Sequence, residues 1–232
     1  MINNLKNIEG DVNMKKKVAV IHTSFVSVED LKTLFKEIIP EVEMINIVDD
    51  SLLAEVSANG HITPAIIRRV CTYALQAEAL GVDLIFNQCS SVGESVDIAR
   101  NMLKVPYIKV DEPMAEEAVK IGGKISVIAT VQSTMGPSVR LIEKAAIEMG
   151  KKVEIRKCLV AGALDILMKE GNKEKHNRLV LNEIEKVAND SDVIVLAQGS
   201  MIGLLPLLNH IKTPILTSPR LGVERVKKVL GL

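Results

Sequence analysis

Two patterns of hydrophobic residues alternate along the chain, one typical of strands and one typical of helices. Short runs rich in Val and Ile predict β-strands at residues 17–22, 41–48, 82–87, 106–110, 124–130, 153–160, 191–197 and 213–217. Between them, apolar residues recur at helical spacing, most clearly in 27–38, 63–80, 138–149 and 175–188. Strands that alternate with helices are typical of an α/β fold with mostly parallel sheets, in which ligands bind at the carboxyl ends of the strands.

The second half of the chain resembles the first. Residues 18–27 match residues 125–134 at an offset of 107 positions, and 105–113 match 213–221 at an offset of 108. The segment that begins at residue 83 matches the one that begins at residue 192, in an alignment that places Cys89 on Gly199 at an offset of 110. Three matches in the same order and at nearly one offset predict two similar lobes.

Composition argues against several classes of protein. The 232 residues include 29 basic and 29 acidic residues and only 2% aromatic residues, which disfavours a nucleic-acid partner. No apolar run is long enough to span a bilayer, and the polar extension at residues 1–13 lacks the apolar core of a signal peptide. We therefore expect no membrane segment and a cytoplasmic location. The sequence carries no signature of a zinc, phosphate or dinucleotide site, so we expect no metal and no cofactor.

Cys89 is the main candidate for chemistry. It lies in the segment NQCSSVGE, between the strand at 82–87 and a helical pattern, where unpaired N–H groups and the helix dipole favour a thiolate. This setting predicts a lowered pKa for Cys89 and a reactive thiol. The alternative is a small side chain packed beneath a turn. Asn87, Ser90 and Ser91 are predicted either to cap the helix alone or also to hold a substrate carboxylate at its N-terminus.

The other cysteines and two histidines are weaker candidates. Cys71 lies on the apolar face of a predicted helix and Cys158 lies within a predicted strand, so both are expected to be buried and inert. His22 ends the first strand and His61 lies in a loop after the second, on the side where the site is expected. Each is either an acid or base in the cleft or an ordinary side chain outside the chemistry.

Five segments, taken together and in this order, resemble the aspartate/glutamate racemase superfamily: NQCSSVGE, VDEPMAEEAV, VIATVQSTMGPSVRLIEKAA, VLAQGSM and TSPRLGVERV. That superfamily includes hydantoin racemases, maleate isomerases and arylmalonate decarboxylase, and the resemblance covers roughly residues 15–230. It implies two pseudo-symmetric α/β lobes across a cleft, with the C-terminal helix returning to the first lobe. The expected limits are 14–111 plus 218–232 for the first lobe and 112–217 for the second.

The resemblance also implies cofactor-independent chemistry next to a substrate carboxylate, with one cysteine from each lobe. It makes the polar residues of the strand-end turns candidate donors to a carboxylate or an enediolate: Thr23, Ser24, Thr130, Ser133, Thr134, Gln198, Gly199 and Ser200. Helix capping is the alternative role for Ser133 and Thr134. Gln198 can donate hydrogen bonds but cannot act as a base near neutral pH.

This chain departs from the family pattern at the second cysteine. Inversion at carbon needs a base on one face and an acid on the other, but only Cys89 is present and Gly199 stands at the aligned position. The expected function is an isomerase or racemase that acts beside the carboxylate of a small amino acid or related acid, with Cys89 moving the proton. A single-cysteine decarboxylase of a malonate-like acid and a non-catalytic binder of small acids remain alternatives. A homo-oligomer is compatible with the sequence, which leaves the oligomeric state open.

Overall fold

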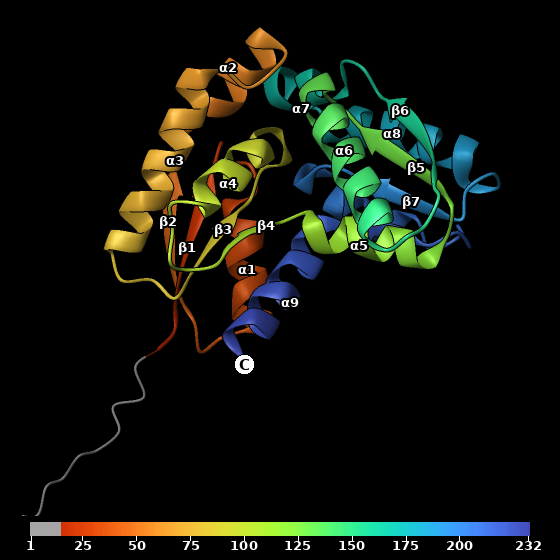
Figure 1. The fold of residues 1–232 in the computed structure, drawn as a ribbon. Coiled ribbons are helices and arrows are strands. Elements are labelled where there is room, and N and C mark those ends of the chain that lie inside the picture. The colour runs from red at the N-terminus through yellow and green to blue at the C-terminus, as the bar shows by residue number, and fades with distance from the viewer. Residues whose placement is uncertain (1–14) are drawn as a thin grey trace, which may run out of the picture.

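The structure is a computed structural model that describes residues 15–232, so the predicted extension at 1–13 lies outside the described residues. Figure 1 shows two α/β lobes side by side, with the first half of the chain in one and most of the second half in the other. None of the helices within residues 15–232 is both long enough and apolar enough to cross a membrane.

Each lobe contains a four-stranded parallel sheet, in the order β2-β1-β3-β4 or β6-β5-β7-β8. The two orders are the same when the strand numbers of one are shifted by four, as the sequence repeat predicts. All eight predicted strands are confirmed: β1 Lys17–His22, β2 Glu43–Val48, β3 Leu84–Asn87, β4 Tyr107–Lys109, β5 Lys124–Ala129, β6 Glu154–Leu159, β7 Val193–Leu196 and β8 Ile215–Thr217.

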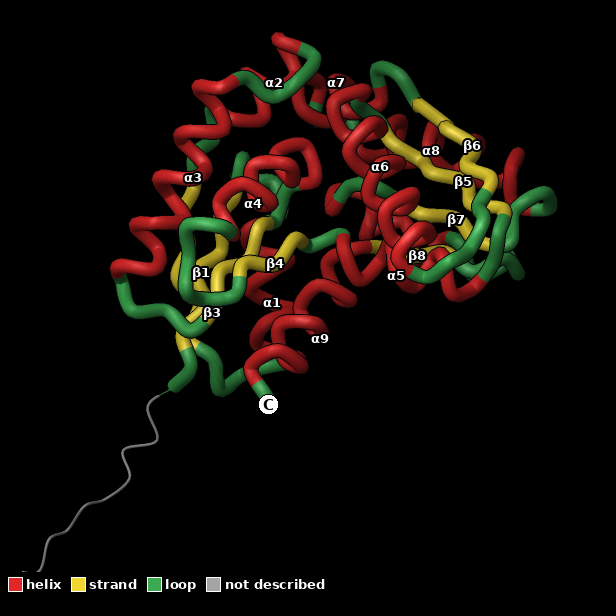
Figure 2. Tube along the Cα trace, in the orientation of Figure 1, coloured by secondary structure: helices red, strands yellow, loops and turns green. Residues whose placement is uncertain are grey.

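Helices fill the connections between the strands (Figure 2). In the first half of the chain they are α1 Val28–Ile38, α2 Leu52–Asn59, α3 Pro64–Ala79, the 3-10 helix η1 Ser90–Val92, α4 Gly93–Arg100 and α5 Glu112–Ile121. In the second half they are α6 Gln132–Glu148, α7 Ala163–Glu170, α8 Lys173–Ala188, the 3-10 helix η2 Gly199–Leu207 and α9 Ser218–Leu230.

Helix α6 begins six residues before the segment 138–149 that periodicity predicts for it. Gly136 and Pro137 are poor helix formers, which hides this part of the helix in the sequence. In the structure Ser133, Thr134 and Met135 are buried, and α6 packs against η1 of the first lobe. Tertiary packing therefore extends the helix beyond its local pattern, and this extension brings Thr134 to the space between the lobes.

Apolar helix faces cover both sides of each sheet. In the first lobe α1 and α9 cover one side, while α3 and α4 cover the other. In the second lobe α5 and α6 cover one side, while α8 and η2 cover the other. Because neither side faces water, strands such as Val193–Leu196 are continuously buried rather than alternately apolar and polar.

The last helix of each repeat crosses to the other lobe. Helix α5 follows β4 of the first sheet but packs on the second sheet, whereas α9 follows β8 of the second sheet but packs on the first. The two crossing helices contact each other, and Arg225 of α9 pairs with Glu116 of α5. Gly222 lets α9 approach β3 closely, since a Cβ at this position would lie 2.8 Å from Cζ of Phe86.

Candidate active site

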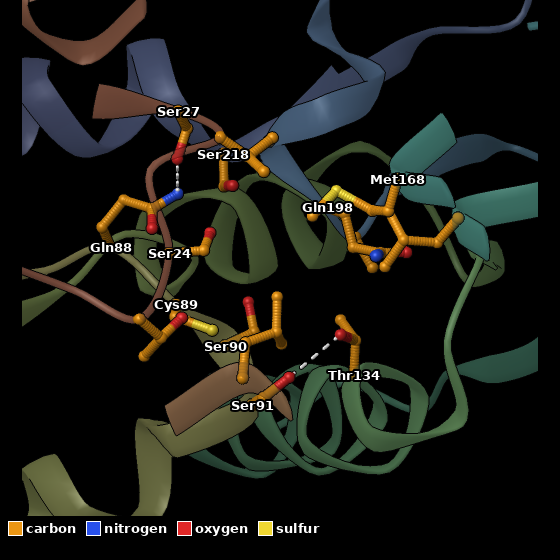
Figure 3. Close-up of a pocket in the computed structure, with 16 residues that line it drawn as sticks. Ser24, Ser27, Gln88, Cys89, Ser90, Ser91, Thr134, Met168, Gln198 and Ser218 are labelled. Carbon is orange, nitrogen blue, oxygen red and sulfur yellow. Dashed lines mark hydrogen bonds between the residues drawn. The ribbon is translucent and has the colours of Figure 1, made fainter. Parts of the chain in front are cut away.

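A cavity lies where the carboxyl ends of the two sheets face each other (Figure 3). The first lobe contributes the turns after β1 and β3, and the second lobe contributes α6, α7 and the turn after β7. Strands of a parallel sheet end at the same edge, so segments far apart in the sequence meet here. The predicted site residues that line this cavity are Thr23, Ser24, Cys89, Ser90, Ser91, Thr134, Gln198 and Gly199.

Cys89 lies between β3 and η1, with its half-buried side chain in the wall of the cavity. Although it lines a space, protein atoms surround the sulfur closely. Burial raises the pKa of the Cys89 thiol, and hydrogen bonds from Thr23 and Ser91 oppose this rise only in part. The predicted lowering of this pKa is therefore wrong, because the N-terminus of the three-residue helix η1 does not outweigh the loss of solvation.

A buried carboxyl group reinforces this effect. Asp111 is only 3% exposed and lies near Ser90, the residue after Cys89, which lowers the pKa of Asp111 in part. Burial raises the pKa of Asp111, and the negative charge of its ionised form raises the pKa of Cys89. The surroundings of Cys89 therefore favour the neutral thiol, which can donate a proton, over the thiolate.

The strand registers identify the second-lobe residue that corresponds to Cys89. Asn87 ends β3 and Leu196 ends β7, and the two residues have equivalent places beside the central strands β1 and β5. Cys89 and Gln198 each follow two positions later, and each occupies the N-cap of a 3-10 helix in extended conformation. The alignment of Cys89 with Gly199 is therefore displaced by one residue, and Gln198 is the structural counterpart.

Backbone hydrogen bonds support the same equivalence. The N–H of Val92 donates to the carbonyl of Cys89, and the N–H of Met201 donates to the carbonyl of Gln198. The alignment that places Cys89 on Gly199 also places Gln88 on Gln198, because an alignment of sequences alone favours identical residues and contains no strand register. That alignment requires one extra residue between β7 and its turn. It therefore shifted the predicted counterpart of Cys89 by one position, from Gln198 to Gly199.

A threonine after the central strand of each lobe contacts each member of this pair. Thr23 lies close enough to the thiol of Cys89 to lower the pKa of that thiol. Thr130, which lies 107 positions later, donates to Oε1 of Gln198 through its backbone N–H at 2.5 Å and through its Oγ1 at 2.9 Å. Since Oε1 accepts both bonds, the amide group of Gln198 has a fixed orientation, and its Nε2 remains as the donor. Figure 3 shows Cys89 and Gln198 on opposite sides of the cavity.

Other predicted residues support the cavity without lining it. Nδ2 of Asn87 donates to the carbonyl of Cys89 at 2.8 Å and so fixes the turn. Thr130 acts through Gln198, as described above. Ser133 lines a neighbouring cavity, and the side chain of Ser200 lies outside what the structure describes. Neither Asn87 nor Ser133 provides a side-chain cap to the helix that follows it.

The two candidate histidines do not lie with Cys89 within residues 15–232. His22 is fully buried, with Nε2 2.9 Å from Oδ1 of Asn46, and burial lowers the pKa of His22. His61 is exposed and lines the same neighbouring cavity as Ser133. Cys71 and Cys158 are buried, as predicted.

Sequence reasoning missed half of the residues that line the cavity: Val26, Ser27, Leu53, Gln88, Leu164, Met168, Ala197 and Ser218. Ser27 was within reach, because it stands 107 positions before Thr134 in the repeat. Gln88 donates to Oγ of Ser27. In contrast, Leu164 and Met168 belong to α7, which no strand-end signal connects to the site.

A hydrogen bond joins the two lobes at the edge of the cavity. Oγ of Ser91 in η1 and Oγ1 of Thr134 in α6 are 3.1 Å apart, and both residues are buried (Figure 3). Nearby, Arg140 of α6 pairs with Glu94 of α4 at the surface. The two walls of the cavity are therefore connected through η1, α4 and α6.

Solved structures share this fold. A glutamate racemase from Francisella tularensis, in complex with D-glutamate, has a TM-score of 0.73 at 14% identity, over 94% of this chain and 81% of that one. Allantoin racemase from Klebsiella pneumoniae gives 0.67 at 16% identity, over 93% and 88% of the two chains. Aspartate racemase from Picrophilus torridus gives 0.66 at 16% identity, over 93% and 94%. These similarities place the chain in the class of two-lobed α/β folds.

The family follows from the sequence itself. The pattern of the Asp/Glu/Hydantoin racemase family matches residues 18–226, so the chain belongs to that family. No curated protein sequence matches the chain significantly. Family membership supports the prediction of a racemase or isomerase that acts on a small acid.

Proposed function

We propose that this protein transfers a proton at the carbon next to the carboxylate of a small acid, with Cys89 as the proton donor and Gln198 as a hydrogen-bond donor across the cavity. Chemistry then takes place on one face of the substrate. The proposal rests on the pair Cys89 and Gln198, which occupy equivalent N-cap positions in the two lobes and both line the cavity. Two identical acids at these positions would serve both faces of a substrate, whereas a thiol and an amide serve only one.

The protonation state of Cys89 favours a donor. Burial raises the pKa of this thiol, so it carries its proton at neutral pH. In the proposed step the S–H bond breaks and a C–H bond forms at the planar carbon of an enediolate, whose electron pair takes the proton. The thiolate that remains accepts hydrogen bonds from Thr23 and Ser91 until it recovers a proton. For proton exchange the sequence of steps begins with the minor thiolate form of Cys89, which takes the substrate proton as the C–H bond breaks and leaves the enediolate. The thiol then exchanges its proton with solvent and returns a proton to the same face.

Gln198 stabilises the enediolate in this proposal. Thr130 holds Oε1 of Gln198, so Nε2 is oriented in advance as a donor to developing negative charge. A preorganised donor of this kind contributes roughly 3 kcal/mol to a transition state. An amide cannot take or give a proton near neutral pH, so Gln198 does not replace a second acid.

A second function needs the same two residues. Loss of carbon dioxide from a malonate-like acid breaks a C–C bond and leaves an enediolate, whose carbon then takes the proton of Cys89. Water restores the proton to the thiolate. This reaction requires one proton donor, so the single thiol favours it over two-base racemisation. The non-enzymatic alternative is a protein that binds small acids without converting them.

Incubation with small acids in deuterium oxide separates these functions. We expect deuterium to enter one face of the substrate carbon, or carbon dioxide to be released with formation of one enantiomer, and both to vanish in Cys89→Ser. Cys71→Ala is the matched control, because it removes a thiol that does not line the cavity. Binding without exchange or carbon dioxide release would leave only the binder, and equal deuterium on both faces would refute one-sided transfer.

A further inference from the structure

Among residues 15–232, no charged side chain lines the cavity beside Cys89. The residues that line it there are all hydroxyl, amide, thiol, glycine or apolar residues. A carboxylate placed in such a cavity can be held by hydroxyl and amide donors, but it receives no ion pair. An ionised group without a partner is costly to remove from water, so each carboxylate beyond the reacting centre disfavours binding.

Several hydroxyls of the cavity are already engaged. Ser27 accepts from Gln88, and the hydroxyls of Ser91 and Thr134 bind each other. Each of these contacts still leaves a hydroxyl hydrogen for a ligand, but every such donor is neutral. A second carboxylate would therefore find hydrogen bonds and no opposing charge among the residues that line the cavity.

Apolar side chains form the outer part of the same cavity. Leu164 and Met168 lie four residues apart on α7, which places them on one face of that helix. Leu53 of α2 and Val26, which follows β1, complete this apolar part from the first lobe. Met168 is 53% exposed and Val26 is 41% exposed, so both retain apolar surface that a ligand can cover.

We propose that the substrate carries an uncharged, apolar substituent on its reacting carbon, which packs against Leu53, Leu164 and Met168, and that acids with a distal carboxylate, such as aspartate and glutamate, bind at least tenfold more weakly. This inference rests on the proposed function for the identity of the reacting centre. It makes α7 a determinant of substrate specificity, because two side chains of this helix line the cavity.

Matched ligand pairs test the proposal. Each pair compares an isobutyl group with a carboxymethyl group of nearly equal size: leucine with aspartate, 5-isobutylhydantoin with hydantoin-5-acetate, and isobutylmalonate with ethane-1,1,2-tricarboxylate. Calorimetry measures the affinity of each ligand, and deuterium exchange and carbon dioxide release are followed separately. We expect the isobutyl member of at least one pair to bind, and in every pair that binds to do so at least tenfold more tightly than its partner.

A charge introduced at the mouth sharpens the test. In Met168→Lys we expect the preference for the isobutyl member to fall at least tenfold, because the ammonium group provides the missing partner for the distal carboxylate. Ile147→Lys is the matched control: Ile147 is 79% exposed on α6, outside the residues that line the cavity, and its replacement should leave the preference unchanged.

The outcomes separate this inference from the proposed function. Tighter binding of the carboxymethyl members, equal binding within the pairs, or no binding of any member overturns the inference. An equal change in both lysine variants also overturns it. A clear isobutyl preference without exchange or carbon dioxide release supports the assignment of the substituent and refutes the proposed proton transfer.

Discussion

The two turns that follow β3 and β7 have the same backbone and different chemistry. Each leaves the end of an inner strand, reaches an extended N-cap residue and enters a 3-10 helix. A threonine from the central strand of the lobe contacts the N-cap side chain in both. That side chain is a thiol in the first lobe and an amide in the second. The repeated fold therefore fixes the positions of the two side chains. In the proposed function, the identity of the second side chain decides whether protons move on one face of the substrate or on both.

The largest effect is expected from removing the thiol. Cys89→Ala should reduce turnover about 1,000-fold, within the range for loss of a general acid. Gln198→Ala should reduce turnover less, about 100-fold, because it removes a hydrogen-bond donor and not the proton. Initial rates, together with thermal melts to show that both variants fold, measure the difference. A greater loss in Gln198→Ala would reverse the roles given to the two turns.

Restoring the second thiol should remove the difference between the lobes. Gln198→Cys is expected to create deuterium exchange on the second face of the substrate, which the added Cys89→Ser change abolishes. Gly199→Cys should fold, since a Cβ at Gly199 meets Nε2 of Gln88 at 3.5 Å and Cβ of Ser27 at 3.7 Å in ordinary contact.

Stereochemical analysis of the exchanged acid distinguishes these two variants. The register predicts a gain in Gln198→Cys and none in Gly199→Cys. A gain in Gly199→Cys alone would support the sequence alignment over the strand register, and no gain in either variant would show that the two N-caps do not face the same carbon.

The pH dependence should follow the raised pKa of Cys89. A thiol acts as an acid only while protonated, and burial moves its ionisation above the ordinary value. We therefore expect carbon dioxide release, which needs the thiol as a proton donor, to persist through neutral pH and to fall as the pH rises past that value. Deuterium exchange, which begins with the thiolate, should instead become faster as the pH rises toward that value. Alkylation should also become faster, with about a tenfold gain per pH unit below the pKa, because the thiolate reacts.

Peptide mapping after alkylation identifies the thiol that responds. Cys89 should be labelled before Cys71 and Cys158, which are 7% and 5% exposed. Rapid labelling of Cys89 already at pH 6 would indicate a lowered pKa and would contradict its assignment as a neutral donor.

The smallest effect concerns the contact between the lobes. Ser91→Ala and Thr134→Val each leave one buried hydroxyl without its partner, at a cost of about 1–3 kcal/mol in the free energy of unfolding. In the double variant both hydroxyls are absent, so a cycle of urea melts should give a coupling of about 1 kcal/mol. Additive losses would mean that the hydrogen bond does not connect the lobes in solution.

Much of the fold was accessible from local pattern. Runs such as the buried Val193–Leu196 are short, apolar and β-branched, and such runs specify strands wherever they lie in a parallel sheet. The repeat at an offset of 107 then predicted two similar lobes, and the strand-end position of Cys89 predicted its place in a cleft. Helix α6 shows the limit, because Gly136 and Pro137 conceal its first turns and only packing against η1 makes them helical.

The site was predicted only where it follows a strand end. Cys89 follows a predicted strand, so the rule for parallel sheets placed it at the cavity. Thr23 and Ser24 also follow a predicted strand, and the family resemblance made them candidates. Leu164 and Met168 lie on α7 of the second lobe, which borders the cavity, and no local pattern indicates that position. The pKa of Cys89 also escaped prediction, because desolvation depends on all the atoms that surround the sulfur.

The sequence by itself determined the strands, the two lobes, the family and the presence of a single thiol at a strand end, because each depends on short segments or on a repeat of the chain. The tertiary structure alone decided which residue faces that thiol, which groups surround its sulfur and which side chains line the cavity. Those properties arise between the lobes. The packing of distant segments sets three features of the cavity: the register that makes Gln198 the counterpart of Cys89, the buried carboxyl of Asp111 near Ser90, and the position of α7. None of these features can be read from local sequence.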